Sequence, residues 1–249
     1  MLELAKVTKR FGGLVAISAL DQSVQRNEFL GIIGPNGAGK TTLLNLITGY
    51  MRPSSGSIRL EGRDINGLPP YAVCRLGIGR TFQVVRPFPE MSVLDNVATG
   101  ALFASGEARS VAEGRKLAQR PLELAGLWEL RDMPASALTI GNKKRLELAR
   151  ALATGPKLLL LDEVMAGLAR GEVDELVKTL RLVHADGITI CMIEHLVHVI
   201  LQLSQRVMVL NFGEKIADGP PEEVIKNPLV IESYLGRPLE DEQEDEHAA

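Results

Sequence analysis

The chain has 249 residues, of which 45% are hydrophobic and 24% charged, and its net charge is −3. This balance is ordinary for a globular protein and gives no reason to expect a nucleic-acid partner, and the longest aliphatic runs are far too short to span a membrane. The opening residues lack the apolar core of a signal peptide, and Cys74 and Cys191 lie too far apart for a metal-binding pair, so we expect a soluble protein of a reducing compartment.

The apolar pattern predicts strands and helices that alternate along most of the chain. Aliphatic runs such as KLLLLDE (157–163) are typical of strands buried on both faces, and apolar residues at helical spacing mark the helices. Between 91 and 137 helical stretches dominate, which indicates an inserted helical region. The alternation predicts an α/β fold with a mainly parallel sheet. In chain order, the predictions are strands at 2–7, 29–34 and 57–65, a helix at 40–50 between the second and third of these, then a strand at 157–163, a helix at 171–187, a strand at 188–195, a hairpin at 205–219 and a helix within 220–228.

The stretch GPNGAGKT (34–41) fits the pattern G-x-x-x-x-G-K-[ST] between a predicted strand and a predicted helix, which is the context that this motif requires. Glycines allow backbone N–H groups to curl around phosphate oxygens. Lys40 can then reach the β- and γ-phosphates, and the Thr41 hydroxyl can ligate Mg²⁺. The alternative is a plain glycine-rich turn, which the flanking elements disfavour. The expected nucleotide-binding residues are Gly34, Pro35, Asn36, Gly37, Ala38, Gly39, Lys40, Thr41 and Thr42.

Two acids, Asp162 and Glu163, follow four leucines at the end of a predicted buried strand. We expect Asp162 to hold Mg²⁺, directly or through water. Glu163 is the expected general base, because in-line attack on the γ-phosphorus needs a polarised water. The alternative is a solvated acidic pair that ends the strand, and the phosphate-binding motif makes this alternative less favourable.

Gln83 and His195 are further candidates for the same site. Gln83, in GRTFQVV, offers an amide to the metal or to water, and His195 closes the predicted strand ITICMIEH. A histidine at that strand end is suited to hydrogen-bond the γ-phosphate or the attacking water. His198 lies three residues further on, but a metal pair with His195 is disfavoured because the chain has no HExxH motif.

The stretch LTIGNKKRLELARAL (138–152) has the features of half of an anion site. Gly141 lies at the start of a predicted helix, and a helix N-terminus has unpaired N–H groups and a positive dipole end. No acid, nucleophile or metal-ligand pattern stands beside it in the sequence. The sequence alone therefore leaves the other half of this site unassigned.

The motifs GPNGAGKTT, Gln83, residues 138–152, LLLLDE and His195, in this order and spacing, resemble those of the ATP-binding cassette (ABC) ATPases over about residues 1–236. The resemblance implies ATP and Mg²⁺ as cofactors, with Gln83 and Asp162 beside Thr41 at the metal. Catalysis would fall to Glu163, His195, Gln83 and Lys40. It also implies that the signature loop lies at Leu138–Asn142, with Thr139, Gly141 and Asn142 at the nucleotide, and that Phe11 stacks on adenine.

The same resemblance implies a P-loop NTPase core of the α/β class with a mainly parallel sheet, an N-terminal antiparallel β region and an inserted helical subdomain. The expected ATP-binding core is discontinuous, at 1–90 and 141–236, and the helical signature subdomain spans 91–140. Residues 237–249 are expected to form an acidic disordered tail, because a run of like charges repels itself.

Three segments resemble the branch that powers branched-chain amino-acid importers. They are FGGLVAI near the start, RLGIGRTFQVVRPFPEMSVLDNVATGA and GEKIADGPPEEVIKNPLVIESYLG near the end. The resemblance implies a second cassette subunit, identical or different, two integral membrane permease subunits and, indirectly, a solute-binding protein. It places the chain peripherally on the cytoplasmic face of the inner (plasma) membrane. In this family the signature loop of one subunit faces the ATP of the other, and RPFPEMSV (86–93) would dock on a membrane subunit.

Several positions depart from the family pattern. The signature serine is Thr139, its glutamine is Asn142, and the loop after Glu163 ends in Ala169 where Asp or Asn is usual. These changes motivate an alternative, in which a catalytically weakened cassette acts as an ATP-dependent clamp or regulatory partner. A soluble cassette that acts on DNA or ribosomes is a further alternative, disfavoured because the chain has neither a second cassette nor a long coiled insertion. The sequence does not name the solute, since amides and urea use similar importers.

Overall fold

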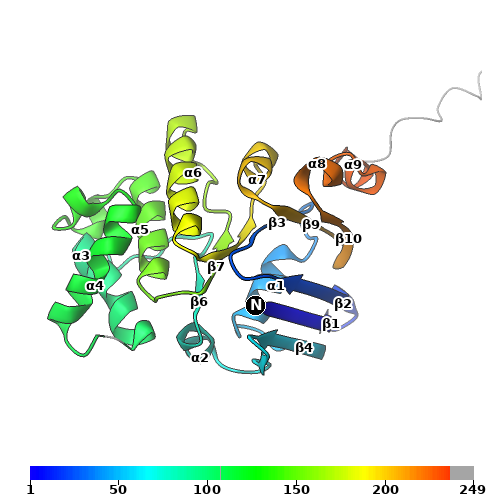
Figure 1. Cartoon of the computed structure of the whole chain (residues 1–249), viewed down its shortest axis with the longest axis horizontal. Coiled ribbons are helices and arrows are strands. Elements are labelled where there is room, and N and C mark those ends of the chain that lie inside the picture. The colour runs from blue at the N-terminus through cyan, green and yellow to red at the C-terminus, as the bar shows by residue number, and fades with distance from the viewer. Residues whose placement is uncertain (107, 236–249) are drawn as a thin grey trace, which may run out of the picture.

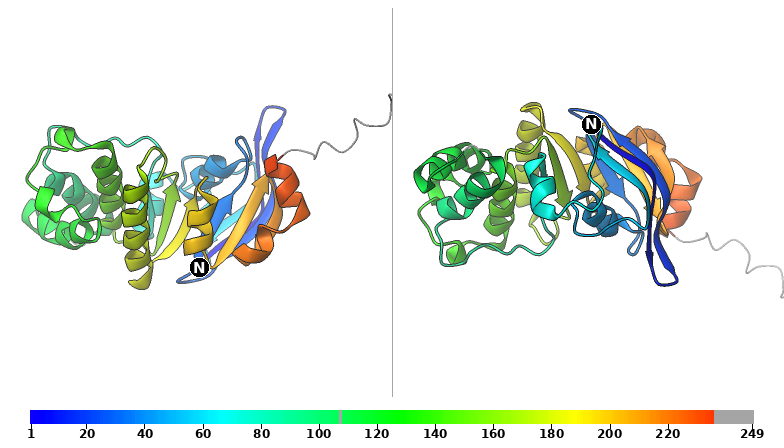
Figure 2. Two further views of the ribbon diagram at one scale, coloured as in Figure 1. Left: turned by 90° about the horizontal axis from the view of Figure 1, so that it is seen from above. Right: turned by 90° about the horizontal axis from the view of Figure 1, so that it is seen from below.

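The computed structural model describes residues 1–106 and 108–235 of the chain. Within these residues, two β-sheets and a group of helices lie along one long axis (Figure 1). The helices between 93 and 152 form one end of the molecule, and the sheets with their covering helices form the rest (Figure 2).

The larger sheet has the order β10-β9-β3-β8-β7-β6 among the described residues. Its strands are β3 (Phe29–Ile33), β6 (Ile78–Arg80), β7 (Leu158–Asp162), β8 (Thr189–Ile193), β9 (Arg206–Asn211) and β10 (Glu214–Gly219). All pairs are parallel except that of β9 with the edge strand β10. Every residue of β3, β7 and β8 is buried, which accounts for their aliphatic sequences. The predicted α/β class with a mainly parallel sheet is confirmed.

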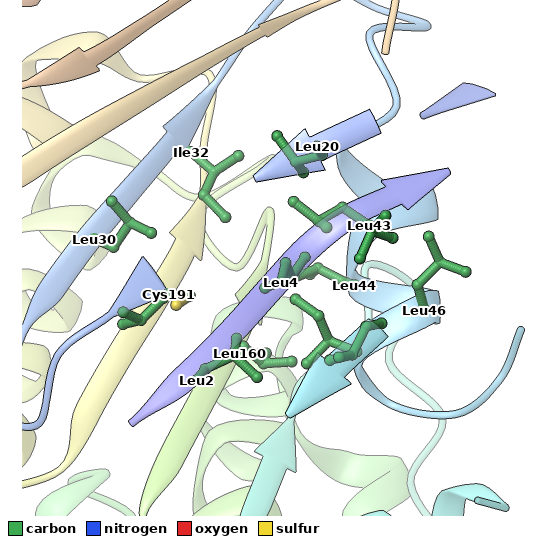
Figure 3. Close-up of a cluster of buried hydrophobic side chains, with 14 of the residues drawn as sticks. Leu2, Leu4, Leu20, Leu30, Ile32, Leu43, Leu44, Leu46, Leu160 and Cys191 are labelled. Atoms are coloured by element: carbon green, nitrogen blue, oxygen red, sulfur yellow. The ribbon is translucent and has the colours of Figure 1, made fainter. Parts of the chain in front are cut away.

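The smaller sheet is antiparallel and packs against the larger one. Its strands are β1 (Leu2–Phe11), β2 (Leu14–Val24), β4 (Ser55–Leu60) and β5 (Arg63–Asp64), in the order β2-β1-β4-β5. Strand β2 was not predicted as a separate strand, because its sequence LVAISALDQSV includes small and polar residues. Leucines of β1 meet the apolar face of α1 (Lys40–Ile47) and side chains of the larger sheet in the core between the two sheets (Figure 3).

The opposite face of the larger sheet is covered by α6 (Arg170–Ala185), α7 (Val197–Leu203), α8 (Pro221–Val224) and α9 (Pro228–Leu235) (Figure 1). The predicted apolar side of α6 is buried at all of its positions: Val173, Leu176, Val177, Leu180 and Val183. Helix α1 ends at Ile47 rather than at Tyr50, because Gly49 takes a left-handed conformation with φ of 76° that stops the helix.

The helical end of the molecule has a hydrophobic core of its own. Its elements are α3 (Val93–Gly100), η1 (Ala101–Ser105), α4 (Val111–Leu124), η2 (Trp128–Leu130), η3 (Ala135–Ala137) and α5 (Ile140–Leu152), and α2 (Pro70–Arg75) lies near η1. Leu146 and Ala149 of α5 belong to this core, whereas Leu148 and Leu152 join the core beside α6. The sequence-based boundary at 140 stays a prediction, since α5 serves both parts. The predicted tail at 237–249 lies outside the described residues.

Candidate functional site

The phosphate-binding motif forms the turn between β3 and α1. Gly34 and Gly39 have φ angles of 155° and 102°, and each lies against a backbone carbonyl oxygen. A Cβ atom on Gly34 would stand 2.1 Å from the oxygen of Leu210, and one on Gly39 would stand 2.5 Å from that of Ala16. Larger residues are therefore excluded at both positions, and the turn is held in the form that presents backbone N–H groups to an anion.

Lys40 begins α1 and is buried against this turn. Its Nζ donates to the carbonyl oxygens of Gly34 and Pro35, at 2.6 and 3.0 Å. Burial lowers the pKa of Lys40, while the charges of Glu163 and Asp162 act in the opposite direction. Thr41, the next residue, is exposed at the first turn of the helix.

Asp162 is the last residue of β7 and is 2% exposed. Its Oδ2 pairs with Nη2 of Arg80 at 2.9 Å, whereas Oδ1 is buried and has no hydrogen-bond partner among the described residues. Burial raises the pKa of Asp162, and Arg80 counteracts the rise. A buried carboxylate oxygen without a donor suits a metal ion or a metal-bound water, because the desolvated atom is otherwise costly.

The Glu163 carboxylate is hydrogen-bonded on both of its oxygens. Nε2 of Gln83 donates to Oε2 at 2.6 Å, and Nε2 of His195 lies 3.0 Å from Oε1. Its backbone N–H donates to the oxygen of Ile193, and its φ of 50° is uncommon for a residue other than glycine, at a cost of about 1–2 kcal/mol. The structure thus brings together three residues that the sequence had placed separately.

The three residues expected at the metal offer a hydroxyl (Thr41), an amide (Gln83) and a carboxylate (Asp162). Oxygen ligands of this kind, completed by phosphates and waters, fit Mg²⁺. The described residues hold no group of three or more His, Cys, Asp or Glu side chains placed for a metal, so His195 and His198 take part in none.

The loop that follows Glu163 is held by three charged side chains that the sequence analysis did not single out. Lys144 donates to the carbonyl oxygens of Glu163, at 3.4 Å, and of Ala166. Glu194 is 2% exposed and accepts from the N–H of Met165 at 2.8 Å. Burial lowers the pKa of Lys144 and raises that of Glu194.

The same loop ends at the start of α6. Oε2 of Glu172 accepts from the N–H of Ala169 at 2.9 Å, and Ala169 itself provides no side-chain cap. The contact of Glu172 is thus local, whereas Lys144 and Glu194 hold the loop by contacts between distant parts of the chain, which no local sequence pattern reveals.

The signature stretch forms the N-terminus of α5. Thr139 is the N-cap, and its hydroxyl accepts from the N–H of Asn142 at 3.2 Å. The methyl group that distinguishes threonine from serine therefore leaves the cap intact. Gly141 is buried against the Glu172 carboxylate, whereas Ile140 is 70% exposed. Figures 1 and 2 place α5 and α1 in separate parts of the molecule.

Comparison with known proteins identifies the family. The model of the ABC transporter family matches residues 17–166, and that of the branched-chain amino acid ATP-binding cassette transporters matches 214–239, partly beyond the described residues. The chain belongs to the ABC transporter family. The expected family and the ATPase activity that goes with it are thereby confirmed.

Two curated relatives of this ABC cassette are similar over nearly their whole length. Each is 39% identical over 251 residues, which cover 95% of this chain and 98% of the relative. One is the high-affinity branched-chain amino acid transport ATP-binding protein BraF of Pseudomonas aeruginosa, and the other is the corresponding protein LivG of Escherichia coli K12.

Solved ABC cassettes share the fold. The ADP conformation of the cassette MJ1267 has a TM-score of 0.85 and 32% identity, and the similarity covers 95% of this chain and 98% of that one. The cassette MJ0796, solved as a dimer in a post-hydrolysis state bound to ADP and Pi, has a TM-score of 0.80 and 27% identity, with 89% and 99% covered.

Phe11, the expected adenine-stacking residue of this cassette, ends β1 and is 45% exposed. Nζ of Lys9 lies 5.0 Å from the centre of its ring. Phe11 is therefore a surface aromatic and not a core residue, which leaves its ring available for stacking on a base.

The segment 86–93, expected to dock on a membrane subunit, borders a groove of about 440 Å³. Asn96, which is fully buried, fixes the segment by accepting from the N–H of Phe88 and donating to its oxygen. Five aromatic residues line the groove: Tyr50, Tyr71, Phe82, Phe88 and Phe103. Sequence analysis had indicated the segment 86–93, which contains Phe88, as a docking surface, whereas the other four aromatic residues come from four separate places in the chain. Within the described part of the cassette, no helix combines the length and the apolar character that a membrane crossing requires.

Proposed function

We propose that this cassette hydrolyses ATP to power an importer of branched-chain or related amino acids, by ATP-driven dimerisation and hydrolysis-driven release. Support for the solute class comes from the branch-specific match at 214–239 and from the names of the similar proteins BraF and LivG. Support for the chemistry comes from the geometry around Glu163, where one carboxylate is hydrogen-bonded by Gln83 and by His195. This arrangement is the observation that carries the proposal.

The proposed roles follow from the atoms that each residue presents. Backbone N–H groups of the 34–41 turn and the Lys40 ammonium bind the β- and γ-phosphates. Thr41, Gln83 and Asp162 hold Mg²⁺, which neutralises charge on the phosphates when it is bound. Phe11 stacks on the adenine.

Glu163 takes a proton from the water that attacks the γ-phosphorus. His195 orients this carboxylate and, after the nucleotide enters, hydrogen-bonds the γ-phosphate. The two carboxylate oxygens of Glu163 are already held in place before the proton is taken, because Gln83 and His195 each bind one of them.

The second half of the site comes from another cassette subunit. The N-terminus of α5, with Thr139, Gly141 and Asn142, points its unpaired N–H groups at the γ-phosphate bound by the other chain. Thr139 and Ile140 are exposed and therefore accessible to a second subunit. The dimeric state of MJ0796 supports this arrangement. ATP then joins two surfaces, and its hydrolysis releases them.

The groove beside 86–93 docks a helix of an integral membrane permease. Two such permease subunits pair with two cassettes, and a solute-binding protein delivers cargo without touching this chain. The aromatic lining suits an apolar helix face, and it includes Phe82, the sequence neighbour of Gln83, so docking and nucleotide binding share one segment. The cassette thus resides peripherally on the cytoplasmic face of the inner (plasma) membrane.

The alternative of a weakened cassette that serves as an ATP-dependent clamp is not favoured. Its motivation was the altered positions Thr139, Asn142 and Ala169, yet Thr139 still caps α5. The expected catalytic residues Lys40, Gln83, Glu163 and His195 are all present in this chain, and Gln83 and His195 are hydrogen-bonded to Glu163.

The Glu163→Gln variant tests the proposal. Phosphate release by the purified chain, or by the complex reconstituted with its partners, should fall roughly 10²–10⁴-fold, because the general base is lost, while ATP retention on a filter persists. Glu175→Gln is the matched control, since Glu175 is exposed on α6 and pairs with Lys178. Wild-type turnover in Glu163→Gln would refute the assigned role, and absent ATPase activity in the wild-type complex would favour the clamp.

A further inference from the structure

Arg80 is a cation beside the nucleotide region whose side chain is almost completely enclosed. It ends β6, and its side chain is 6% exposed. Nη2 donates to Oδ2 of Asp162 at 2.9 Å, while Nη1 donates to Oδ1 of Asn45 at 2.7 Å and to the Thr48 hydroxyl at 3.2 Å. The guanidinium is thereby fixed between α1 and β7, and its planar fork cannot turn without breaking a contact on either side.

These contacts determine how the Asp162 carboxylate is turned. Arg80 occupies Oδ2, and the Asp162 N–H is bonded separately to the Thr81 hydroxyl at 3.3 Å. Oδ1 is left buried and without a donor among the described residues. A carboxylate held by one oxygen presents the other in a fixed direction, as metal-ligating carboxylates require.

We propose that Arg80 is a positioning residue for the divalent cation: by binding Oδ2 of Asp162 it aims Oδ1 at the metal of the Mg-nucleotide. The inference rests on the proposed function, because it takes Asp162 as a metal-holding residue. In this proposal the effect of Arg80 on the metal passes through Asp162, to which Arg80 is hydrogen-bonded.

The same guanidinium is part of the groove wall. It lies 5.0 Å from the ring centre of Phe82 and 5.9 Å from that of Tyr50, and all three residues line the groove. The Arg80 side chain thus contacts both the aromatic wall of the groove and the carboxylate of Asp162, which ends β7.

The test measures metal binding directly. With the full chain and saturating ATP, the dissociation constant of Mn²⁺ is determined by electron paramagnetic resonance, and ATP affinity is measured separately in EDTA. Arg80→Met should weaken Mn²⁺ binding about tenfold and leave the metal-free ATP affinity unchanged. Arg80→Lys should recover part of the loss, because lysine keeps the charge but not the fork.

Arg115→Met is the matched control, since Arg115 forms a two-point pair with Asp95 on the helical end of the molecule. Its Mn²⁺ affinity should equal that of the wild type. Unchanged Mn²⁺ affinity in a folded Arg80→Met overturns the proposal. So does a proportional loss of metal-free ATP affinity, which would mark a merely structural role.

Removing Arg80 leaves Asp162 buried and unpaired, which can prevent folding. In that event Asn45→Ala decides, because it removes the nearer of the two acceptors of Nη1, leaving the Thr48 hydroxyl, and does not expose a buried charge. A smaller loss of Mn²⁺ affinity supports the proposal, and wild-type affinity in both Asn45→Ala and Arg80→Lys overturns it.

A double variant separates this inference from the proposed function. Asp162→Asn should itself weaken Mn²⁺ binding; if it does not, the metal assignment of Asp162 fails, and the inference falls with it. If it does, Arg80→Met combined with Asp162→Asn should lose no more affinity than Asp162→Asn alone. Additive losses overturn the positioning role while the proposed function stands.

Discussion

The phosphate turn and the start of α5 are the two helix starts that we propose to bind phosphate, but the structure completes them differently. Around the turn, Lys40, Asp162 and Glu163 are partly or wholly buried and bonded to groups of the same chain. At α5, Thr139 satisfies its own helix, and the side chain of Ile140 faces solvent. In the proposed site, one half is therefore assembled by folding, and the other half is completed by association with a second chain.

This difference separates two kinds of mutational effect. Changes at the turn remove groups that are already positioned, so ATP binding by a single chain should suffer. Changes at α5 leave that binding intact and act on the assembly of two chains. Four variants test the comparison. The first two act on ATP binding and dimerisation and the last two on thermal stability, each pair in order of decreasing effect.

Lys40→Ala should have the largest effect on a single chain. It removes a buried ammonium that reaches the phosphates, which corresponds to roughly 10²-fold weaker ATP retention for a lost charged hydrogen bond of about 3 kcal/mol. Filter binding measures this loss. Lys178→Ala, on the exposed side of α6, is the control. Wild-type retention in Lys40→Ala would contradict the assignment of the phosphate turn.

Asn142→Asp should disrupt the function of the α5 start in the dimer while preserving the fold. An acid in the first turn of α5 favours the helix dipole but repels the partner's γ-phosphate, so ATP-dependent dimerisation should fall roughly tenfold. Light scattering of the Glu163→Gln background with ATP measures the dimer.

Ala112→Asp adds the same charge to the exposed first turn of α4 and should leave the dimer unchanged. If monomeric Asn142→Asp failed to bind ATP, the start of α5 would contribute to ATP binding within one chain, which would contradict the comparison.

Lys144→Met tests the loop that links the two halves. Lys144 is on α5 but donates to the oxygens of Glu163 and Ala166. Its removal should cost about 2 kcal/mol, which for a chain of this size lowers the melting temperature by roughly 4–8 °C. The neighbouring Lys143→Met is the matched control, because Lys143 takes no part in this contact. Equal melting temperatures in the two variants would argue against a stabilising role of the Lys144 contact.

Ala169→Asn should have the smallest effect, and in the opposite direction. Ala169 is the N-cap of α6 and has no side-chain acceptor. Asparagine there should stabilise the chain by about 1 kcal/mol, or roughly 2–4 °C in melting temperature. Ala169→Val, a poor cap, should show no such gain in a thermal melt.

Sequence predicted the parts of the site whose chemistry is local. The phosphate turn is a continuous stretch, and Asp162 and Glu163 follow directly from the leucine run of β7. The order of these motifs was enough to identify the family and the α/β fold. Burial also followed from periodicity in α6, because a single helix face meets the sheet.

What the sequence did not predict depends on contacts between distant segments. Arg80 and Asp162 are 82 positions apart, and Glu194 is 29 positions from Met165. No periodicity relates such pairs, since their proximity is created by the order of strands in the sheet. Strand β2 was missed for a related reason: its small and polar residues are stabilised by pairing with β1 rather than by their own pattern.

The exposed start of α5 also shapes how a dimer would respond to the supply of ATP. In the proposed arrangement, each complete site needs the turn of one chain and the α5 terminus of another, so a symmetric closed pair contains two nucleotides. When closure requires both, the closed population follows the product of two occupancies rather than a single one. Import would then decline more steeply than ATP binding as the ATP concentration falls. The transporter would therefore respond to the ATP concentration with a threshold.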